Sequence, residues 1–210
     1  MQKYNQIVIG SILGDGSLSP LTKKQQFSTL DVSQNIDKLP YLKWLYKKLG
    51  KDFLLNPIKQ KKGFEQMFRF RSKPSRTLGI LRSKFYSSHN GKKIIPLDIQ
   101  EILTEPITLA VWYMDDGTLD KRDKYHFNSC IATYCFTFKE CDMLKKTLKN
   151  NFGLNVSVNQ STMRGKIYPR IYIKSESMKD FIKIIKPHIQ PVFNYKVGDL
   201  ASSAYKIGIE

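Results

Sequence analysis

Two apolar stretches of the chain end in the same Asp-Gly pair. Residues 8–16 read VIGSILGDG and residues 109–117 read LAVWYMDDG. Each stretch is long and apolar enough for a buried helix, and an Asp lies where that helix is expected to end. Asp15 and Asp116 are 101 residues apart, about half of the 210-residue chain. The pair therefore indicates an internal duplication.

The rest of the sequence supports this duplication, because other segments repeat at nearly the same distance. Three pairs share an offset of 103 residues: 69–72 (RFRS) with 172–175 (YIKS), 49–50 (LG) with 152–153 (FG), and Lys93 with Lys196. Several segments that agree in offset within two residues indicate two copies of one structural unit. The short connection between the copies predicts two halves, 1–100 and 101–210, that pack as a single unit.

Each half is predicted to have the order α-β-β-α-β-β-α, which makes the chain an α+β protein of two pseudo-symmetric halves. After the opening helix, the elements expected in the first half are strands 16–24 and 26–33, a helix near 41–48, strands 53–60 and 66–72, and a helix at 75–85. Those expected in the second half are strands 118–125 and 128–136, a helix near 143–150, strands 155–160 and 167–174, and a helix at 177–185. We expect Asp37 to cap the first middle helix, and Thr137 with Glu140 to form a capping box on the second.

The charge of the chain predicts a polyanionic partner. Lys and Arg number 35 against 18 Asp and Glu, which gives a formal net charge of +17. The basic residues are divided almost evenly between the halves, so they are not a tail on a neutral body. Nucleic acid is the simplest partner for such a surface, although a merely solvated Lys-rich surface is the alternative. No apolar run is long enough for a membrane span, and three Cys without companion His ligands do not indicate a disulfide framework or a zinc site.

The two Asp-Gly pairs suggest a cation site. A helix C-terminus carries a partial negative charge, and an Asp placed there adds to the negative field unless a cation binds nearby. If the pseudo-symmetry brings Asp15 and Asp116 together, their carboxylates offer the oxygen ligands that Mg²⁺ prefers. The backbone carbonyls of Gly14 and Asp115 could complete the set. Gly10 and Gly14 are four residues apart, so this helix face allows another helix to approach closely.

These two motifs resemble the signature of the LAGLIDADG homing endonucleases in their two-motif monomeric form, and the resemblance covers essentially the whole chain. It is strongest to mitochondrial large-rRNA intron endonucleases and their bacterial relatives. The resemblance implies a DNA-binding β-saddle and a monomer that uses Mg²⁺ (or Mn²⁺) to cut double-stranded DNA at one long, rare site. The staggered cut leaves 3′ extensions and promotes spread of the intron or insertion that encodes the enzyme.

The resemblance also implies roles for particular residues. Asp15 and Asp116 correspond to the catalytic metal ligands, while Lys93 and Lys196 correspond to basic residues near the scissile phosphates. Gln34 matches a polar residue that organises solvent at the site. In the second half Tyr134 is predicted to occupy the place of Gln34, which suggests that the two strands are cut at unequal rates.

DNA contacts are expected from basic and amide side chains on the strands and their turns, because a β-ribbon can enter the major groove. Whether each one meets a base or a phosphate stays open. The candidate residues are Lys23, Lys24, Lys59, Lys61, Lys62, Arg69, Arg71, Lys121, Arg122, Asn159, Arg164, Lys166, Arg170 and Lys174.

Another activity fits the same resemblance. Some family members are RNA maturases that help their host intron to splice without cutting DNA, so host-intron RNA is an alternative partner. A transcriptional regulator and an intein are disfavoured, because neither an added helix-turn-helix domain nor flanking splicing domains are found. The expected location is a mitochondrion or another organelle, with the bacterial cytoplasm as the alternative, and no membrane partner is expected.

Overall fold

The computed structural model describes residues 4–21, 26–122 and 126–198. The first half contains these elements: α1 (Gln6–Leu13), β1 (Ser17–Leu18), β2 (Leu30–Asn35), the 3₁₀ turn η1 (Ile36–Lys38), α2 (Leu39–Leu49), β3 (Lys59–Lys61), β4 (Phe64–Arg71) and α3 (Arg76–Phe85). The second half contains these: α4 (Ile99–Ile102), α5 (Pro106–Asp116), β5 (Gly117–Arg122), β6 (His126–Ala132), α6 (Phe138–Phe152), β7 (Val156–Met163), β8 (Lys166–Ile173), α7 (Ser175–Ile185), η2 (Lys186–His188) and η3 (Pro191–Lys196).

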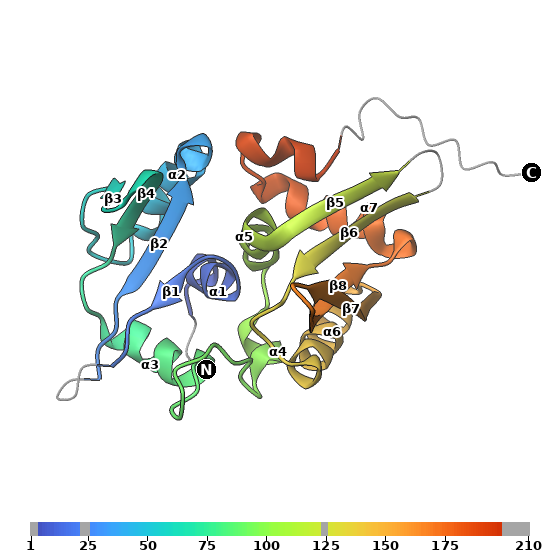
Figure 1. Cartoon of the computed structure of the whole chain (residues 1–210), viewed down its shortest axis with the longest axis horizontal. Helices are drawn as coiled ribbons and strands as arrows, with labels where there is room; N and C mark the ends of the chain where they lie inside the picture. The colour runs from blue at the N-terminus through green and yellow to red at the C-terminus, as the bar shows by residue number, and fades with distance from the viewer. Residues whose placement is uncertain (1–3, 22–25, 123–125, 199–210) are drawn as a thin grey trace, which may run out of the picture.

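The predicted α+β class and the doubled helix-and-strand order are confirmed. Each half contributes one antiparallel four-stranded sheet, with strand order β1-β2-β4-β3 in the first and β5-β6-β8-β7 in the second. The helices α1 and α5 lie side by side in the middle of the molecule, with one sheet on either side (Figure 1). One continuous core of buried apolar side chains runs through both halves.

The closeness of α1 and α5 depends on two glycines of α1 and its cap. A Cβ atom on Gly10 would lie 2.6 Å from the carbonyl oxygen of Thr108 and 2.7 Å from Cβ of Val111. A Cβ atom on Gly14 would lie 2.5 Å from Oδ2 of Asp115. Any side chain at these two positions would push the helices apart. The predicted close-approach face is therefore present, and its partner is α5.

Several predicted boundaries are wrong, for local reasons. The expected strand at 26–33 is replaced by β2, which begins at Leu30, because Gln26 has a positive φ of 56° that breaks the extended chain. The expected strand at 53–60 is reduced to β3, since Pro57 lacks the amide proton that a strand interior needs. In the second half β6 ends at Ala132, where a turn closes with the Phe136 amide bonded to the Thr133 carbonyl.

The two helix-cap predictions have opposite outcomes. Thr137 and Glu140 form the predicted capping box on α6. Asp37 does not cap α2: it lies within the 3₁₀ turn η1, and the residue at the cap position is Lys38, which makes no side-chain cap hydrogen bond. The extra turn before α2 moves the start of the helix past Asp37.

The strand register corrects the pairing of Gln34 with Tyr134. In the first sheet Asp31 lies between Ser17 and Arg71, and in the second Cys130 lies between Thr118 and Tyr172. Asp31 and Cys130 are thus equivalent. Gln34 and Thr133 each lie three residues further along, so Thr133 and not Tyr134 is the counterpart of Gln34. The sequence alignment misses this because the offset between the halves is 103 at the middle helices but 99 at these strands.

We expect Gly10→Ala to destabilise the protein by about 1–3 kcal/mol, because the added methyl overpacks the contact between α1 and α5. For a chain of this size, that loss lowers Tm by roughly 2–4 °C per kcal/mol. Thermal unfolding followed by circular dichroism measures the change. Lys43→Ala, on the exposed side of α2, is the control and should leave Tm nearly unchanged. An unchanged Tm for Gly10→Ala would contradict the close packing.

Candidate active site

The ends of α1 and α5 bring three carboxylates together. The backbone amide of Asp15 donates to Oδ2 of Asp115 at 3.1 Å, which ties the end of one helix to the end of the other. Asp15 is exposed, whereas Asp115 and Asp116 are half-buried. The negative charge of Asp15 is close enough to raise the pKa of both other carboxyls. The predicted convergence of the two motifs is therefore present in the structure.

Gln34 bridges two of these carboxylates from β2. Its Nε2 donates to Oδ2 of Asp15 at 2.9 Å and to Oδ1 of Asp115 at 3.3 Å. The Gln34 side chain is buried, and β2 places it there by its strict alternation of inward and outward residues. An amide in this position fixes the orientation of the Asp15 carboxylate. The sequence prediction that Gln34 belongs to the site agrees with this placement.

Asp115 turns its carboxylate into the protein. In addition to the Asp15 amide and Gln34, its Oδ1 accepts a hydrogen bond from the Tyr41 hydroxyl at 2.9 Å. Burial and the Asp15 charge raise the pKa of Asp115 well above its ordinary value. Three donors make this carboxylate a structural link between the halves, which leaves its backbone carbonyl as the group it could offer to a cation.

The second half has no equivalent of the Gln34 amide. The hydroxyl of Thr133 is buried and donates to the Pro169 carbonyl at 2.8 Å. The Tyr134 hydroxyl pairs with Ser161 Oγ at 3.3 Å, on the neighbouring strand. Within the described residues, no side chain bonds to Asp116 as Gln34 bonds to Asp15. The polar surroundings of the two catalytic candidates are thus unequal.

Two lysines approach the helix ends from late in each half. Nζ of Lys93 donates to the Gly14 carbonyl at 2.7 Å, and Nζ of Lys196 donates to the Met114 carbonyl at 2.6 Å. Burial lowers the pKa of Lys93, and it lowers the pKa of Lys196 to about 8. The predicted pair is therefore found at equivalent ends of the central helices, with each ammonium held on a backbone carbonyl.

Burial sets the protonation of Asp116. It raises the pKa of this carboxyl to about 7, with a further contribution from the Asp15 charge, while Lys93 and Lys196 act in the opposite direction. Carboxyls with pKa values near neutrality gather at functional sites. A bound cation would favour the ionised form and so oppose the effect of burial.

The donor set fits a hard divalent cation. Asp15 and Asp116 supply carboxylate oxygens, and the carbonyls of Gly14 and Asp115 supply neutral ones, which together match the preference of Mg²⁺ or Mn²⁺ for oxygen ligands. The Gly14 carbonyl already accepts from Lys93 but keeps a second lone pair. In the part of the chain that the structure describes, no three His, Cys, Asp or Glu side chains form a ready-made metal cluster. Water and substrate oxygens would have to complete the coordination.

A cavity of about 420 Å³ opens at the second half of the site. Its lining residues come from the end of α5, the start of β5 and η3: Asp115, Asp116, Gly117, Thr118, Leu119, Tyr195 and Lys196. Tyr195 is 65% exposed at its edge. The sequence analysis missed Tyr195 and the buried Tyr41, because an isolated Tyr carries no signal until the fold places it beside a carboxylate.

The candidate DNA-contacting residues are distributed over the open faces and turns of both sheets. In the first sheet, Lys59 on β3 lies directly opposite Arg69 on β4, and Arg71 shares their face. In the second, Asn159 on β7 lies opposite Arg170 on β8, and the opposite face of β8 carries the buried Ile171 and Ile173. Each sheet thus buries one face and leaves a basic one open.

The remaining candidates lie at strand ends and turns. Lys61 ends β3 with its ammonium 4.7 Å from the centre of the Phe64 ring, and Lys62 follows in the turn. Arg164 lies in the β7–β8 turn at φ 51°, with Lys166 and Lys174 at the two ends of β8. Lys121 and Arg122 are the last two residues of β5. Lys23 and Lys24 fall outside the described residues.

Comparison with known proteins accounts for this arrangement. A model of the LAGLIDADG DNA endonuclease family matches residues 5–181, which include both central helices and both sheets. The chain belongs to this family. The resemblance of its two motifs to the LAGLIDADG signature is thereby confirmed.

The relatives that match this chain include a maturase and an intron-encoded endonuclease. Cytochrome b mRNA maturase bI2 of Saccharomyces cerevisiae (strain ATCC 204508 / S288c) is 31% identical over 207 residues, which cover 92% of this chain and 47% of the maturase. Intron-encoded endonuclease ai4 of Dictyostelium discoideum is 35% identical over 138 residues, covering 65% of this chain and 80% of that protein. The chain spans about half the length of several curated relatives, including that maturase.

A solved structure supports the LAGLIDADG fold independently. The homing endonuclease I-WcaI bound to its DNA recognition sequence has a TM-score of 0.76 to this chain at 23% sequence identity, covering 94% of this chain and 88% of the other. This likeness shows that the two-sheet arrangement is that of a homing endonuclease.

No helix in the described residues is long and apolar enough to cross a membrane.

We expect Asp116→Asn to stabilise the metal-free protein at pH 8 and to have little effect near pH 4. The pKa of Asp116 is about 7 in the folded chain and near 3.8 in the unfolded one, so the folded state binds the extra proton between these values. Stability of the wild type therefore falls as pH rises through this window, and Asn removes that loss.

Thermal unfolding in EDTA at the two pH values measures this difference. An increase in Tm of about 2–4 °C at pH 8 corresponds to roughly 1 kcal/mol. Asp180→Asn, on the exposed face of α7, is the matched control and should show no pH-dependent gain. A lower Tm for Asp116→Asn at pH 8 would contradict the electrostatic cost at this site.

Proposed function

We propose that the chain is a site-specific endonuclease that cuts both strands of DNA at a long, rare target. The observation that carries the proposal is the meeting of Asp15 and Asp116 at the adjoining ends of α1 and α5, with Gln34, Lys93 and Lys196 around them. One acid comes from each half, as a reaction on two antiparallel DNA strands requires. Membership of the LAGLIDADG DNA endonuclease family supports the same activity.

The substrate is double-stranded DNA bound across the two open sheet faces. A β-ribbon fits the major groove, and the net charge of +17 favours a phosphate backbone. The scissile phosphates of the two strands would lie over the central helix ends, and the resemblance to homing endonucleases implies a staggered cut with 3′ extensions. A monomer suffices, because the chain itself supplies both halves of the site.

Asp15 and Asp116 would hold Mg²⁺ or Mn²⁺, together with the carbonyls of Gly14 and Asp115. A divalent cation at such a site neutralises charge on the phosphate and lowers the pKa of bound water. Side chains of the protein would orient the ligands and the attacking water. Gln34 fixes the Asp15 carboxylate, and its remaining N–H and carbonyl can orient a water molecule.

The two lysines supply positive charge where the phosphate gains negative charge during hydrolysis. Each ammonium is held at a fixed helix end by a backbone carbonyl, so it needs little reorganisation when the substrate arrives. Lys196, with a pKa of about 8, is mostly protonated at pH 7 and can also donate a proton to the leaving oxygen.

The gene that encodes the chain is proposed to lie within an intron or similar insertion, whose spread the double-strand break promotes. The relative named intron-encoded endonuclease supports this setting. A mitochondrion or another organelle is the proposed location, and the bacterial cytoplasm is the alternative.

A second candidate function is RNA maturation, in which the chain binds its host intron and assists splicing without cutting DNA. The relative named mRNA maturase, which is 31% identical, favours it. We rank it second because both catalytic acids are present and held together. The same basic faces could bind RNA. The two functions are therefore distinguished by whether the chain cuts DNA, and not by whether it binds nucleic acid.

The test of the proposed nuclease is cleavage of a randomised DNA library, first in Mg²⁺ and then in Ca²⁺. We expect cutting with Mg²⁺ and binding alone with Ca²⁺. Asp15→Asn and Asp116→Asn should each abolish double-strand cleavage, a loss of at least about 10³-fold, because each removes a charged ligand from the reacting centre.

DNA binding by both variants, measured in Ca²⁺, should stay within a few-fold of wild type, since neither residue lies on the open sheet faces. Asp142→Asn, exposed on α6, is the control for loss of a carboxylate elsewhere. Near-wild-type cutting by either active-site variant would refute the assignment. Binding of intron RNA without DNA cutting by the wild type would favour the maturase.

We also predict that the two strands are cut in a fixed order. Gln34 fixes the carboxylate of Asp15, whereas the Thr133 and Tyr134 hydroxyls are bonded elsewhere, and no amide side chain among the described residues bonds to Asp116. Supercoiled plasmid with one target site should pass through a nicked form before the linear product, and strand labelling should show the same strand cut first.

Two variants test the source of this order. Gln34→Ala should change the ratio of the two strand rates by about tenfold or more, because it removes an oriented hydrogen bond at one scissile phosphate. Tyr134→Phe loses only a contact to Ser161 and should leave the ratio unchanged. Random order in the wild type, or an equal effect of both variants, would contradict the role of Gln34.

A further inference from the structure

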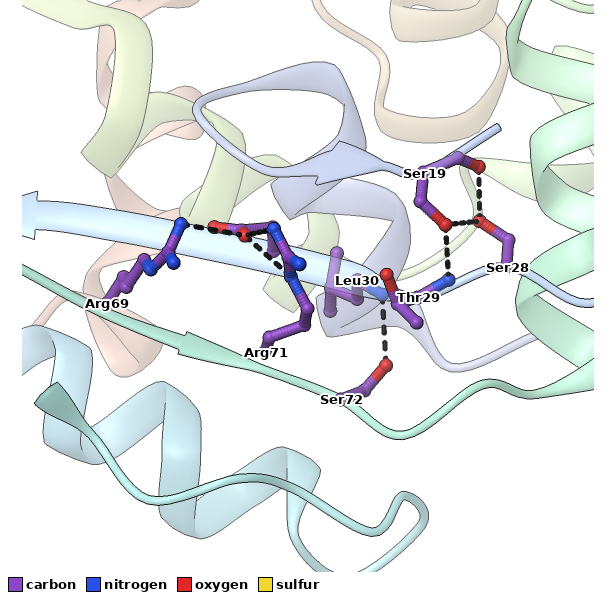
Figure 2. A network of polar contacts seen from close by, with 8 residues as sticks. Ser19, Ser28, Thr29, Leu30, Arg69, Arg71 and Ser72 are labelled. Carbon is purple, nitrogen blue, oxygen red and sulfur yellow. Dashed lines mark hydrogen bonds and ion pairs between the residues drawn. The ribbon is translucent and has the colours of Figure 1, made fainter. Parts of the chain in front are cut away.

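The open face of the first sheet carries a carboxylate among its basic residues. Asp31 on β2 lies directly opposite Arg71 on β4, and Arg69 is the diagonal neighbour on the same face. Nε and Nη2 of Arg71 both donate to Oδ2 of Asp31, at 2.9 and 2.7 Å, and Nη1 of Arg69 lies 3.7 Å from the same oxygen (Figure 2). An acid is unexpected on a face proposed to bind a polyanion.

The second sheet has different side chains at the equivalent register positions. At the register positions of Asp31 and Arg71 it has Cys130 and Tyr172, while Arg170 matches Arg69. The second sheet carries its own acid on this face, Asp120 on β5, but at another register position, so the pairing of an acid on the second strand with an arginine directly opposite is specific to the first half. A feature that appears in only one copy of a duplicated surface is suited to reading one part of an asymmetric target.

The ion pair holds Arg71 in one orientation and leaves part of it free. Nε and one N–H of Nη2 are used by Asp31, so both N–H groups of Nη1 and the second of Nη2 remain. One N–H of Nη1 and the second N–H of Nη2 lie parallel at the end of the guanidinium, and together they form the planar fork that matches O6 and N7 of guanine in the major groove. The Arg71 side chain is 51% exposed and that of Asp31 only 19%, so the arginine extends beyond the acid toward the solvent side.

The backbone next to this pair is fixed by the hydroxyls of the buried Ser28 and Ser72 and the half-buried Ser19. The amide of Leu30 donates to Oγ of Ser72 at 2.9 Å, and that of Thr29 donates to Oγ of Ser19 at 3.0 Å. Ser28 adds a 2.7 Å bond from its hydroxyl to the Ser19 carbonyl (Figure 2). These contacts hold the residues next to Asp31 to β1 and β4, which gives the ion pair a rigid base.

A carboxylate next to the arginines disfavours a phosphate at this point. It offsets one of the two positive charges and repels an approaching phosphate oxygen, whereas base edges carry no net charge. For an arginine that contacts a phosphate, this repulsion opposes any gain in orientation. An arginine that reads a base gains orientation, because less freedom is lost when the contact forms.

We propose that Asp31 is a positioning residue that orients Arg71 to recognise a guanine in the major groove, which makes the pair a determinant of target specificity. The inference rests on the proposed function of the chain as a DNA-binding endonuclease. It assigns Arg71 to base recognition, an assignment that the sequence left open between base and phosphate.

Binding in Ca²⁺ to a randomised duplex library, followed by binding to single-base variants of the selected target, tests the proposal. Arg71→Lys keeps the charge and removes the fork, so preference for guanine should fall about 5- to 150-fold at one base pair. Asp31→Ala should reduce preference at the same base pair, while binding to non-specific DNA becomes tighter because a negative charge is lost. Asp31→Asn, nearly isosteric, should show the same change in weaker form.

Lys166→Ala, at the exposed start of β8, is the matched control. It should weaken binding to all sequences alike. The slope of log K against log salt concentration should become shallower by about one, because one phosphate contact is lost. Thermal unfolding verifies that each variant is folded. If Arg71→Lys and Asp31→Ala alter affinity uniformly, or act at different base pairs, the proposal is overturned while the endonuclease function stands. If the wild-type chain selects no sequence, the proposed function fails and this inference fails with it.

Discussion

The contact between α1 and α5 is the interaction on which the rest of the structure depends. Gly10 and Gly14 leave no side chain between the helices, so the two helix ends meet closely enough for the Asp15 amide to bond to Asp115. That contact joins the two halves, sets the spacing of the two sheets and places one acid from each half at the same point. A larger residue at either glycine would separate α1 from α5, and it would also move Asp15 away from Asp115 and Asp116.

The same contact concentrates negative charge in a partly buried place. Burial raises the pKa of Asp115 and Asp116, and the negative charge of Asp15 raises both further. The chain offsets this cost with donors rather than with direct ion pairs: Gln34 and Tyr41 bond to the carboxylates, while Lys93 and Lys196 bond to nearby carbonyls. A site that holds unfavourable charge in the absence of ligand is suited to bind a cation and to release it with little reorganisation.

Duplication gives the protein two similar open sheet faces, and divergence between the copies makes their side chains different. Gln34 has a buried threonine as its counterpart, and the Asp31–Arg71 pair has Cys130 and Tyr172. Both differences involve the second strand of each half, β2 and β6 with the residue that follows it. In the proposed endonuclease, a symmetric frame would bind two antiparallel DNA strands, while these side-chain differences would allow each half to recognise and cut its own strand.

The sequence alone determined the α+β class, the doubled order of elements and the identity of the paired acids and lysines, because the apolar helical runs and their Asp-Gly ends survive in both copies. The four-residue spacing of Gly10 and Gly14 also predicted the face of α1 on which another helix packs closely. Only the tertiary structure decided the strand register, since the offset between the copies changes with loop length and a shift of one residue exchanges Thr133 for Tyr134. It also decided the partners of Asp115 and Asp31, because contacts such as those of Tyr41 and Arg71 join residues that are 74 and 40 positions apart and leave no local pattern in the sequence.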